Sequence, residues 1–505
     1  MAEQPLQYAR LKERVGKVPV STKIYQGVGA WPNTFKDFAF NTFLLFYYNQ
    51  VLGIPATLAS IAMAIALVID AISDPLVGSY SDNLRSRLGR RHPLMYAAAL
   101  PLGFFLWATF SPPGGLSEIQ LFVWLTTFAI ATRLSLTFFL VPWNAVFAEF
   151  TDDYNERTEI ITYRYALGWA GGLTFTFLAW TFIFPKTEEY PDFGQLNPDA
   201  YHLFAPVLGV AVALAVLFTT HMTRREIPYL YHPTEALPPF RFANVFGELV
   251  LALKNRDFMF LFLMILIGAI IAGTGGAFDL YMGTYFWGLA GEDMRWYAVA
   301  IIGVAVAFMF LNKLQRRFDK KDILVWGLMI SLIDGIAFVN LRFLDVLPDN
   351  GDPLLLQLIV VNRIFRAAVL TTVGVIFASM IADLLDAQEL NTGRRQEGVF
   401  SAALSFSGKV TGGVGVVIGG LVLDYVINFP RDAKPGSLDQ DTITLLGIVD
   451  GIVVPLFYLL PFYLASRYKL TRERHAQIRL ELDAKKLALA RKRDIDAAAA
   501  SVVEP

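Results

Sequence analysis

Two aspartates stand four residues apart inside one of the most apolar stretches of the chain. Asp70 and Asp74 lie in the segment VIDAISDP, residues 68–75, and in a helix this spacing places both carboxylates on one face about a turn apart. Two anions at that distance repel each other unless a positive charge lies between them. A bound sodium ion or a shared proton would supply it, because hard cations take several oxygen ligands and paired carboxylates can hold a proton. Pro75 would add a backbone carbonyl that has no helical donor.

Basic side chains could neutralise the same two aspartates instead. Four arginines follow in the next loop, and Lys409 lies deep in a later apolar stretch. Ion pairs with these residues would make the aspartates structural locks rather than a binding site. The sequence leaves both interpretations open for Asp70 and for Asp74.

Other ionisable residues also interrupt apolar stretches, where a charge at the centre of a helix costs about 2.5 to 3.5 kcal/mol. Lys36 and Asp37 are adjacent, so their side chains point about 100 degrees apart and need not pair with each other. We expect both to line a cavity. Farther along, Arg133, Thr137 and Leu140 fall on one helical face.

A second set of cations lies in the C-terminal half. Arg363 and Arg366 share a helical face three residues apart, and Lys409 lies in the stretch that follows. Together with Arg133, these cations favour a substrate that carries an anionic group. The alternative is that acidic residues of the same half neutralise them. The candidates are Asp279, Asp334 and Asp450.

The composition places all of these residues in a membrane protein. Hydrophobic residues make up 55% of the 505 and charged residues 17%, against roughly 25% in soluble domains, and the mean hydropathy is +0.47. A net charge of -1 does not favour nucleic acid, and the absence of cysteine excludes disulfides, thiolate metal sites and cysteine nucleophiles. The histidines form no HExxH pattern, and no Walker A or GxSxG sequence is present. These absences argue against an ATP-driven pump and an intramembrane hydrolase.

Twelve apolar stretches are long enough to span a bilayer. Six precede and six follow a polar segment at 224–257. They cover residues 25–52, 56–80, 94–110, 119–147, 160–184, 203–220, 258–286, 296–311, 323–343, 354–384, 399–426 and 443–464. The chain is therefore predicted to be an all-α polytopic membrane protein of twelve transmembrane helices in two six-helix halves.

Charge alternates between the loops that connect these stretches. The loops 82–92 and 313–322 are rich in arginine and lysine, whereas 188–199, 292–293 and 345–352 are acidic. Because basic loops stay in the cytoplasm, both termini are predicted to be cytoplasmic, in a plasma (inner) membrane. Basic loops recur after the second and the eighth stretch. Such a parallel repeat is typical of the major facilitator arrangement, with a central cavity between two halves.

The predicted organisation has five parts. They are a cytoplasmic arm at 1–24, a first six-helix bundle at 25–223, a cytoplasmic middle loop at 224–257, a second bundle at 258–467 and a cytoplasmic tail at 468–505. The tail mixes charges of both signs with leucines, which suits either a helix on anionic lipid or a solvated charged helix. No function follows from it.

A longer motif surrounds the aspartate pair. It reads DAISDPLVG at 70–78 and SRLGRRHP at 86–93, and shorter pieces occur in the expected order along most of the chain. These pieces are Lys36-Asp37, Val141-Pro142-Trp143, Glu156-Arg157, Tyr163-Arg164 and Gly408-Lys409. Together they resemble the glycoside-pentoside-hexuronide:cation symporters, the melibiose permease group, which also includes a vertebrate sodium-dependent lysophosphatidylcholine transporter. The resemblance implies a major facilitator fold and cation-coupled symport.

The resemblance also implies a cation site. The matching positions are Asp70, Ser73, Asp74 and Thr137, with serine at 73 where the melibiose permease has asparagine. Serine still supplies an oxygen, so a sodium ion held by Asp70 and Asp74 is compatible with the pattern, and so is a proton. The coupling ion is left open.

Substrate contacts are implied in the same way. Lys409 matches a lysine that links the family's cation and substrate sites, and Lys36, Asp37 and Arg164 match positions around its sugar pocket. With the charged residues found above, the predicted substrate-binding residues are Lys36, Asp37, Arg133, Leu140, Asn144, Arg164, Arg363, Arg366 and Lys409.

Two positions depart from the family's pattern. Leu140 stands where melibiose-type permeases carry the aspartate that binds sugar hydroxyls, and Asn144 stands where they carry a tryptophan that stacks on the sugar ring. Galactoside transport is therefore disfavoured. With Arg133 on the same face, a carboxylated glycoside, an organic acid or a zwitterionic lipid would fit better than a neutral disaccharide.

We therefore expect a secondary active transporter rather than an enzyme. It would carry a sugar, glycoside or sugar acid by alternating access, coupled to sodium or a proton and without any other cofactor. Uptake of a lysolipid or another amphipathic anion is the alternative, and an intramembrane enzyme or receptor is a remote one. The expected partners are a small-molecule substrate and membrane lipid but no nucleic acid, and the protein is expected to act as a monomer.

Overall fold

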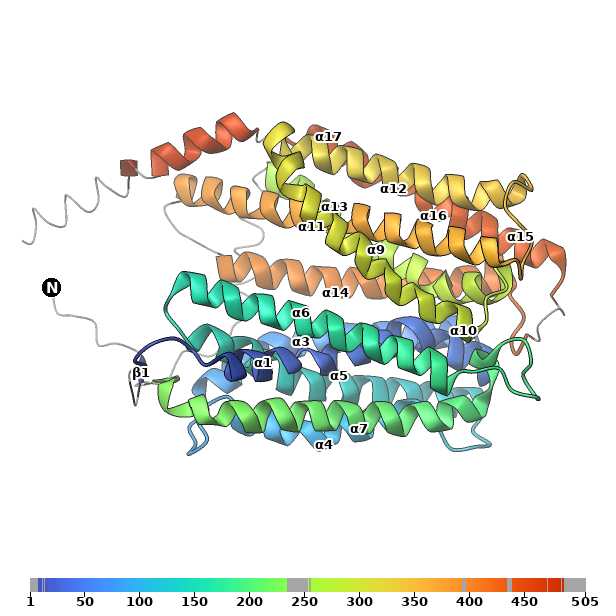
Figure 1. Ribbon diagram of the computed structural model, residues 1–505, viewed down its shortest axis with the longest axis horizontal. Helices are drawn as coiled ribbons and strands as arrows, with labels where there is room; N and C mark the ends of the chain where they lie inside the picture. The colour runs from blue at the N-terminus through green and yellow to red at the C-terminus, as the bar shows by residue number, and fades with distance from the viewer. Residues whose placement is uncertain are drawn as a thin grey trace, which may run out of the picture.

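The computed structural model describes residues 8–10, 12, 14–233, 253, 256–392, 397–433, 438–469, 471–482 and 484–485. This part of the chain is almost entirely helical (Figure 1). Of the predicted middle loop, residues 234–252 and 254–255 lie outside the described residues, as do 486–505 of the predicted tail and 1–7 of the arm.

The first set of elements runs from β1 to β2. It comprises β1 (Tyr8–Arg10), α1 (Val20–Val28), α2 (Trp31–Phe38), the π-helices η1 (Ala39–Leu44) and η2 (Tyr47–Val51), α3 (Ala56–Asn83), α4 (His92–Thr109), α5 (Glu118–Glu149), α6 (Tyr154–Leu178), the π-helix η3 (Ala179–Ile183), the 3-10 helix η4 (Gly194–Leu196), α7 (Pro198–Thr223), the 3-10 helix η5 (Arg224–Tyr229) and β2 (Tyr231–Pro233). The two short strands pair antiparallel.

The second set is helical throughout. It comprises α9 (Arg256–Tyr281), the π-helix η6 (Met282–Phe286), α10 (Gly291–Met294), the 3-10 helix η7 (Arg295–Ala300), α11 (Ile301–Arg317), α12 (Lys320–Phe343), α13 (Pro353–Thr392), α14 (Glu397–Leu421), the π-helix η8 (Val422–Val426), α15 (Gln440–Ile448), the π-helix η9 (Val449–Val453), α16 (Val454–Leu456) and α17 (Leu459–Arg467). A further helix covers 472–482.

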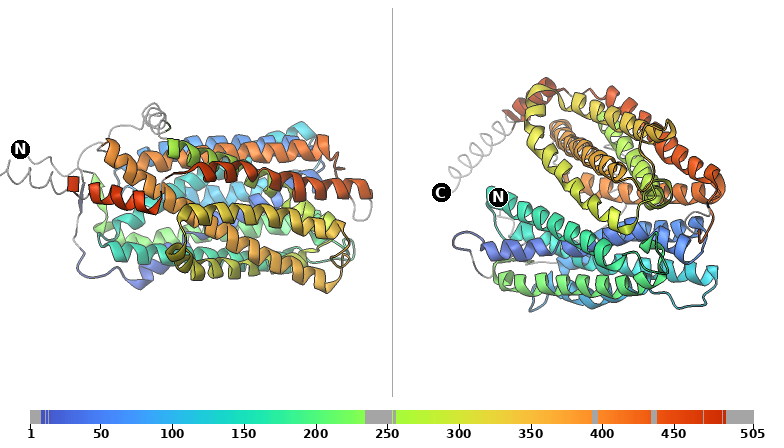
Figure 2. Two further views of the ribbon diagram at one scale, coloured as in Figure 1. Left: turned by 90° about the horizontal axis from the view of Figure 1, so that it is seen from above. Right: turned by 45° about the vertical axis from the view of Figure 1, so that its right-hand side comes forward.

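The helices form two bundles that lie side by side along their length (Figures 1 and 2). In the first bundle, α3 and α4 pack on α5, α4 packs on α7, and α1 packs on α6. The helices at matching places in the second bundle repeat these contacts, because α11 and α12 pack on α13, α12 packs on α17, and α9 packs on α14. The repeat extends to the helix ends, since α6 and α14 each continue into a π-helix. This arrangement confirms the predicted fold of two helical halves with the same topology.

Ten helical segments of the described chain are long and apolar enough to cross a membrane by length and composition. The other two predicted spans are α4, which has 18 residues and packs on α5 and α7, and the first span, which is interrupted after Val28. At that interruption, a Cβ on Gly29 would lie 2.0 Å from Trp143 Nε1 of α5. The chain resumes as α2, where Pro32 lies in the first turn and its missing N–H costs no helical hydrogen bond.

The basic loop after α3 folds back onto its own bundle. Arg90 Nη2 lies 2.7 Å from Glu149 Oε1 at the end of α5, and Arg91 Nη2 lies 2.5 Å from Asp82 Oδ1 at the end of α3. Gly89 has a φ of 73°, a left-handed conformation that favours glycine. The most specific part of the sequence motif therefore ties together the ends of α3, α4 and α5.

One group of polar contacts between the bundles lies at the end of the molecule opposite the two described chain ends; we call this end the distal end (Figure 1, right). Tyr281 Oη donates to Asn49 Oδ1 at 2.7 Å, and Tyr285 Oη donates to Gln50 Oε1 at 2.9 Å. Gln195 Nε2 donates to the Leu289 carbonyl at 3.0 Å. All of these polar side chains are buried, so buried hydrogen bonds close the distal end.

The start of α3 depends on this closure. Its first residue follows Pro55, whose side chain cannot cap a helix. The cap comes from η8 in the other bundle, because Asp424 Oδ1 accepts from Ala56 N at 3.1 Å and Asp424 Oδ2 accepts from Thr57 N at 2.7 Å. A carboxylate is well suited to this place, since the N-terminus of a helix carries partial positive charge.

Replacing this cap should open the distal end. Charged hydrogen bonds contribute roughly 1.5 to 3 kcal/mol, and about 1.4 kcal/mol changes an equilibrium tenfold. The chain has no cysteine, so Asn41→Cys in η1 provides a single labelling site between the bundles. We expect Asp424→Ala to accelerate labelling by a membrane-impermeant maleimide, added on the distal side, by about tenfold or more.

Asp439 offers a matched control. Its carboxylate accepts from Thr442 N at 3.0 Å and caps α15 within one bundle, so Asp439→Ala should leave the labelling rate unchanged. Equal rates in Asp424→Ala and the parent, or equal acceleration in both variants, would show that the Asp424 cap does not hold the bundles together.

Candidate cation and substrate site

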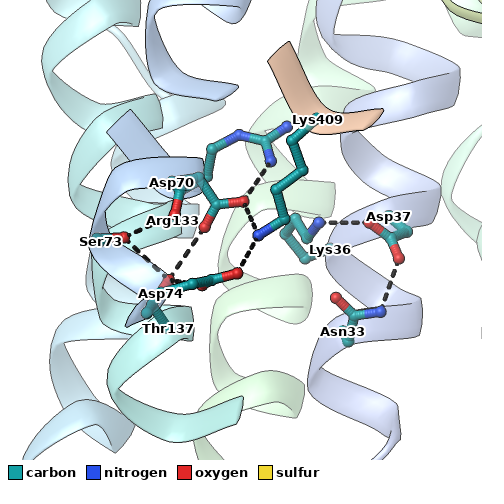
Figure 3. Close-up of polar contacts among 9 residues, drawn as sticks. All are labelled: Asn33, Lys36, Asp37, Asp70, Ser73, Asp74, Arg133, Thr137 and Lys409. Carbon is teal, nitrogen blue, oxygen red and sulfur yellow. Dashed lines mark hydrogen bonds and ion pairs between the residues drawn. The ribbon is translucent and has the colours of Figure 1, made fainter. Parts of the chain in front are cut away.

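The carboxylate pair of α3 faces α5 (Figure 3). Thr137 Oγ1 donates toward both acids, at 3.0 Å from Asp70 Oδ1 and 3.2 Å from Asp74 Oδ1. Ser73 Oγ lies 3.4 Å from Thr137 Oγ1 and 3.0 Å from the Asp70 carbonyl. The four residues predicted as a cation site therefore lie together, with two carboxylates and two hydroxyls.

A positive charge from the other bundle lies between the carboxylates. Lys409 Nζ of α14 is 2.8 Å from Asp70 Oδ2 and 2.6 Å from Asp74 Oδ2 (Figure 3). Of the partners that the sequence left open, the observed one is thus Lys409. Arg90 and Arg91 of the following loop instead pair with acidic residues at the ends of α3 and α5.

Glycines let α14 approach closely enough for this contact. A Cβ at Gly420 would lie 2.2 Å from Ser60 Oγ of α3, and one at Gly415 would lie 2.3 Å from the Ile270 carbonyl of α9. Small residues at such crossings allow helix backbones to pack directly in a membrane. The α14 helix is therefore held between α3 and α9, and this position brings Lys409 to the first bundle.

Arg133 supplies a second cation beside Asp70. It is 7% exposed, and its Nη1 lies 3.4 Å from Asp70 Oδ2. Its guanidinium carbon lies 5.4 Å from the centre of the Phe40 ring, within cation–π range. Its Nε is buried without a hydrogen-bond partner, so part of its donor capacity is unused.

Lys36 and Asp37 lie next to this cluster on α2 (Figure 3). The sequence did not require them to pair, but they form an ion pair, and Asp37 also accepts from Asn33 Nδ2 at 2.8 Å. Lys36 is buried, and a buried ammonium needs a counter-charge. Sequence reasoning missed Asn33 and Phe40, although Asn33 stands four residues before Asp37 and Phe40 four after Lys36, the spacing of one helical face.

Arg164 of α6 lies in different surroundings. Its guanidinium carbon is 3.8 Å from the centre of the Trp143 ring and 4.3 Å from that of Phe147, and it hydrogen-bonds to Asn144. Leu140 is partly buried and packs against the apolar core. Sequence reasoning singled out no aromatic residue here, because aromatic side chains are common throughout membrane helices. Among the described residues, no carboxylate pairs with this guanidinium.

The last two predicted contacts lie within the second bundle. Arg363 Nη2 is 2.8 Å from Asp279 Oδ1, and Arg366 Nε is 3.6 Å from Asp334 Oδ2. These acids are two of the three that could neutralise the cations of this half. Of the predicted substrate-binding lysines and arginines, all but Arg164 therefore lie beside carboxylates. Their presence alone no longer favours an anionic substrate.

Comparisons with known proteins agree with this geometry. The family model described as MFS/sugar transport protein matches residues 25–472. The chain belongs to this family. It is therefore an integral membrane transporter of the major facilitator type rather than an enzyme, which confirms the resemblance and the fold class predicted from the sequence.

Several relatives span nearly the whole chain. The protein named "Uncharacterized symporter sll1374" from Synechocystis sp. is 26% identical over 93% of this chain and 97% of its own. The isoprimeverose transporter of Lactiplantibacillus pentosus is 21% identical over 86% and 90%. The sodium-dependent lysophosphatidylcholine symporter 1 of Xenopus tropicalis is 23% identical over 91% and 89%. Such relatives support cation-coupled transport.

A solved structure shows the same fold. The crystal structure of a bacterial homologue of the iron transporter ferroportin, in an inward-facing state, superimposes with a TM-score of 0.60 at 13% identity, over 89% of this chain and 98% of that one. At this identity the likeness concerns the fold alone.

Removing the Lys409 ammonium would leave two carboxylates facing each other. Breaking a buried ion pair costs roughly 3 to 5 kcal/mol, and we expect part of this cost because the Lys409 side chain is 29% exposed. Lys409→Ala should lower the apparent melting temperature of the purified protein. Sodium should raise it again by taking the freed position, since a ligand of the folded state stabilises that state.

Lys313→Ala provides the control, because Lys313 is an exposed lysine of α11 in the same bundle. It should change neither the melting temperature nor the response to sodium. A Lys409→Ala protein as stable as the parent, with no response to sodium, would show that the ammonium does not balance the pair.

Proposed function

We propose that this transporter is a symporter that couples the uptake of a small polar solute to sodium or a proton. One observation carries the proposal: the carboxylate pair of the first bundle is neutralised by Lys409 of the second bundle. Occupation of the pair by a cation would compete with that ammonium. The state of the cation site is thereby linked to the contact between the bundles, which alternating access must change.

Either coupling ion fits the residues present. For sodium, Asp70, Asp74, Thr137 and Ser73 offer carboxylate and hydroxyl oxygens, the ligands that hard cations take. For a proton, one of two adjacent carboxylates would become neutral, which removes their mutual repulsion. In both cases the Lys409 ammonium loses part of its attraction to the first bundle, and its hydrogen bonds would pass to water or to the substrate.

We propose that the protein lies in the plasma (inner) membrane with both termini in the cytoplasm. The basic loops at the terminal end support it. The distal end, closed by the hydrogen bonds of Tyr281, Tyr285 and Gln195, would then face outward. The described conformation would be the one in which a substrate leaves toward the cytoplasm, and a single chain would suffice for the cycle.

The proposed cargo is a sugar, glycoside or sugar-acid-like solute. The isoprimeverose transporter among the relatives supports this class, and so do the paired charges beside the cation site, because hydroxyl groups both donate to carboxylates and accept from arginine and lysine. Lys36, Asp37, Arg133 and Arg164 are the proposed contacts in the first bundle.

A lysolipid is the second candidate. It is favoured by Leu140, which replaces the family's sugar-binding aspartate with an apolar side chain, and by the lysophosphatidylcholine symporter among the relatives. The stacked guanidinium of Arg164 would suit a phosphate group. Binding of lysophosphatidylcholine, but not of saccharides, to the purified protein would select this candidate.

Neutralising the pair tests the coupling. We expect Asp70→Asn and Asp74→Asn each to weaken equilibrium binding of radioactive sodium by about tenfold or more, since each removes a charged ligand worth roughly 1.5 to 3 kcal/mol. Thr137→Val should weaken it less, because it removes one neutral oxygen. If the parent protein binds no sodium but takes up a proton that Asp74→Asn does not, the coupling ion is the proton.

Asp349→Asn is the matched control, because the Asp349 side chain is fully exposed and pairs only loosely with Arg342 at 3.5 Å. It should bind the coupling ion like the parent. Parent-like ion binding in both Asp70→Asn and Asp74→Asn would exclude this pair as the coupling site.

A further inference from the structure

A cavity lies inside the second bundle, away from the carboxylate pair of the first. Its volume is about 760 Å³, within the range of small-molecule sites. It is bounded by α9, α12, α13 and the helices from η9 to α17, and Asn41 and Thr42 of η1 form its wall toward the first bundle. It is therefore separate from the cation site but in contact with the helix that follows Lys36 and Asp37.

Glycines give this cavity its width. Gly268, Gly275 and Gly276 on α9 and Gly374 on α13 line it, and a Cβ added at any of them would meet no atom within 4 Å. Gly273 of the same helix behaves differently, because a Cβ there would lie 2.4 Å from the Gly412 carbonyl of α14. One face of α9 is thus packed on α14, while the other faces open space.

Part of the charge in the cavity is satisfied. Arg363 is paired with Asp279 at 2.8 Å, and its guanidinium carbon lies 3.4 Å from the centre of the Tyr297 ring. Arg363 therefore has a carboxylate and an aromatic face as partners, and it completes a wall of the cavity.

The remaining charged groups have unused hydrogen-bonding capacity. Arg366 Nε is 3.6 Å from Asp334 Oδ2, too long for a hydrogen bond, and the Arg366 side chain is 56% exposed. Asp334 Oδ1 accepts from Asn362 at 2.7 Å, but its Oδ2 is buried without a hydrogen-bond partner. Within the described residues, Asp450 has neither a hydrogen bond nor an ion pair. Asp450 and the exposed part of the Arg366 guanidinium thus keep hydrogen-bonding capacity toward this space, whereas Asp334 Oδ2 is enclosed beside Arg366.

The balance of charge indicates what this space would accept. The charged residues that line it are three aspartates and two arginines, so an anionic ligand would add to an excess of negative charge. A neutral ligand with many hydroxyl groups meets no such repulsion. Its hydroxyls can donate to the free carboxylate oxygens and accept from the guanidinium.

We propose that this cavity is a binding pocket for a neutral polyhydroxylated solute such as a saccharide, with Asp450 as acceptor and Arg366 as donor. The pocket supplies a carboxylate acceptor that the first bundle lacks at Leu140. This inference rests on the proposed function, since it names the substrate class, and it adds contacts in the second bundle to those proposed in the first.

Filling the pocket provides the main test. Purified protein is assayed by tryptophan fluorescence and thermal shift against neutral mono- and disaccharides, with glucuronate and lysophosphatidylcholine as charged and lipid probes. We expect a neutral saccharide to bind, and Gly276→Leu to weaken its affinity by about tenfold or more, because Gly276 lines the cavity, an added Cβ meets no atom within 4 Å, and the new side chain takes space from the ligand. Asp450→Asn and Arg366→Gln should have similar effects without adding volume.

Gly114→Leu is the control. Gly114 also has open space around it, but it lies in the loop between α4 and α5, so saccharide affinity should be unchanged. Binding of only glucuronate or only lysophosphatidylcholine would overturn the proposal. So would parent-like saccharide affinity in Gly276→Leu, Asp450→Asn and Arg366→Gln.

The two proposals can fail separately. If Asp70→Asn abolishes sodium or proton binding while the cavity variants leave saccharide binding unchanged, the coupling proposal stands and the pocket is excluded. If the cavity variants abolish saccharide binding while Asp70→Asn and Asp74→Asn bind the ion like the parent, the pocket is supported. The carboxylate pair is then excluded as the coupling site.

Discussion

The ion pair between the Lys409 ammonium and the carboxylates of Asp70 and Asp74 is the charged contact that joins the two bundles at the candidate cation site. Two anions on one face of α3 cannot remain charged in an apolar medium without a cation. That cation comes from the other bundle, and it reaches α3 because glycines such as Gly420 let α14 lie directly on it. Any ion that takes the place of the ammonium therefore also changes how strongly the bundles attract each other.

The rule that buried charges need partners organises most of the remaining polar residues. Arg363 stands beside Asp279, and Lys36 beside Asp37. At the distal end, Asp424 satisfies the exposed N–H groups of α3 from across the interface. These contacts do not all serve one purpose, because those at the interface between bundles can break in a transport cycle while those within a bundle need not. Incomplete pairing, as at Arg366, marks the places where a ligand has room to bind.

Much of the site was predictable from local spacing. The i to i+4 aspartates and Thr137 came together because α3 and α5 are regular helices packed side by side. The partner of the pair was open, since Lys409 and the nearby arginines were equally compatible with the sequence. Lys36 and Asp37 show the limit of spacing rules, because a long lysine side chain can reach a neighbour that points elsewhere. The arginines alone favoured an anionic substrate, but two of the acidic residues considered as the alternative, Asp279 and Asp334, lie beside them.

Hydropathy, loop charge and the motif around the aspartates were sufficient to predict the membrane-spanning fold, its repeat and its family. Each of these signals lies in a short continuous stretch of residues. Tertiary structure alone decided which cation balances the pair, how Asp424 caps α3 across the interface, and that the glycines of α9 face two different environments. The physical reason is that each of these features depends on where a helix lies and which side it turns toward a helix far away in the chain. The spacing of Asp70 and Asp74 predicts that a positive charge lies nearby, but only the packing of α14 shows that this charge is Lys409.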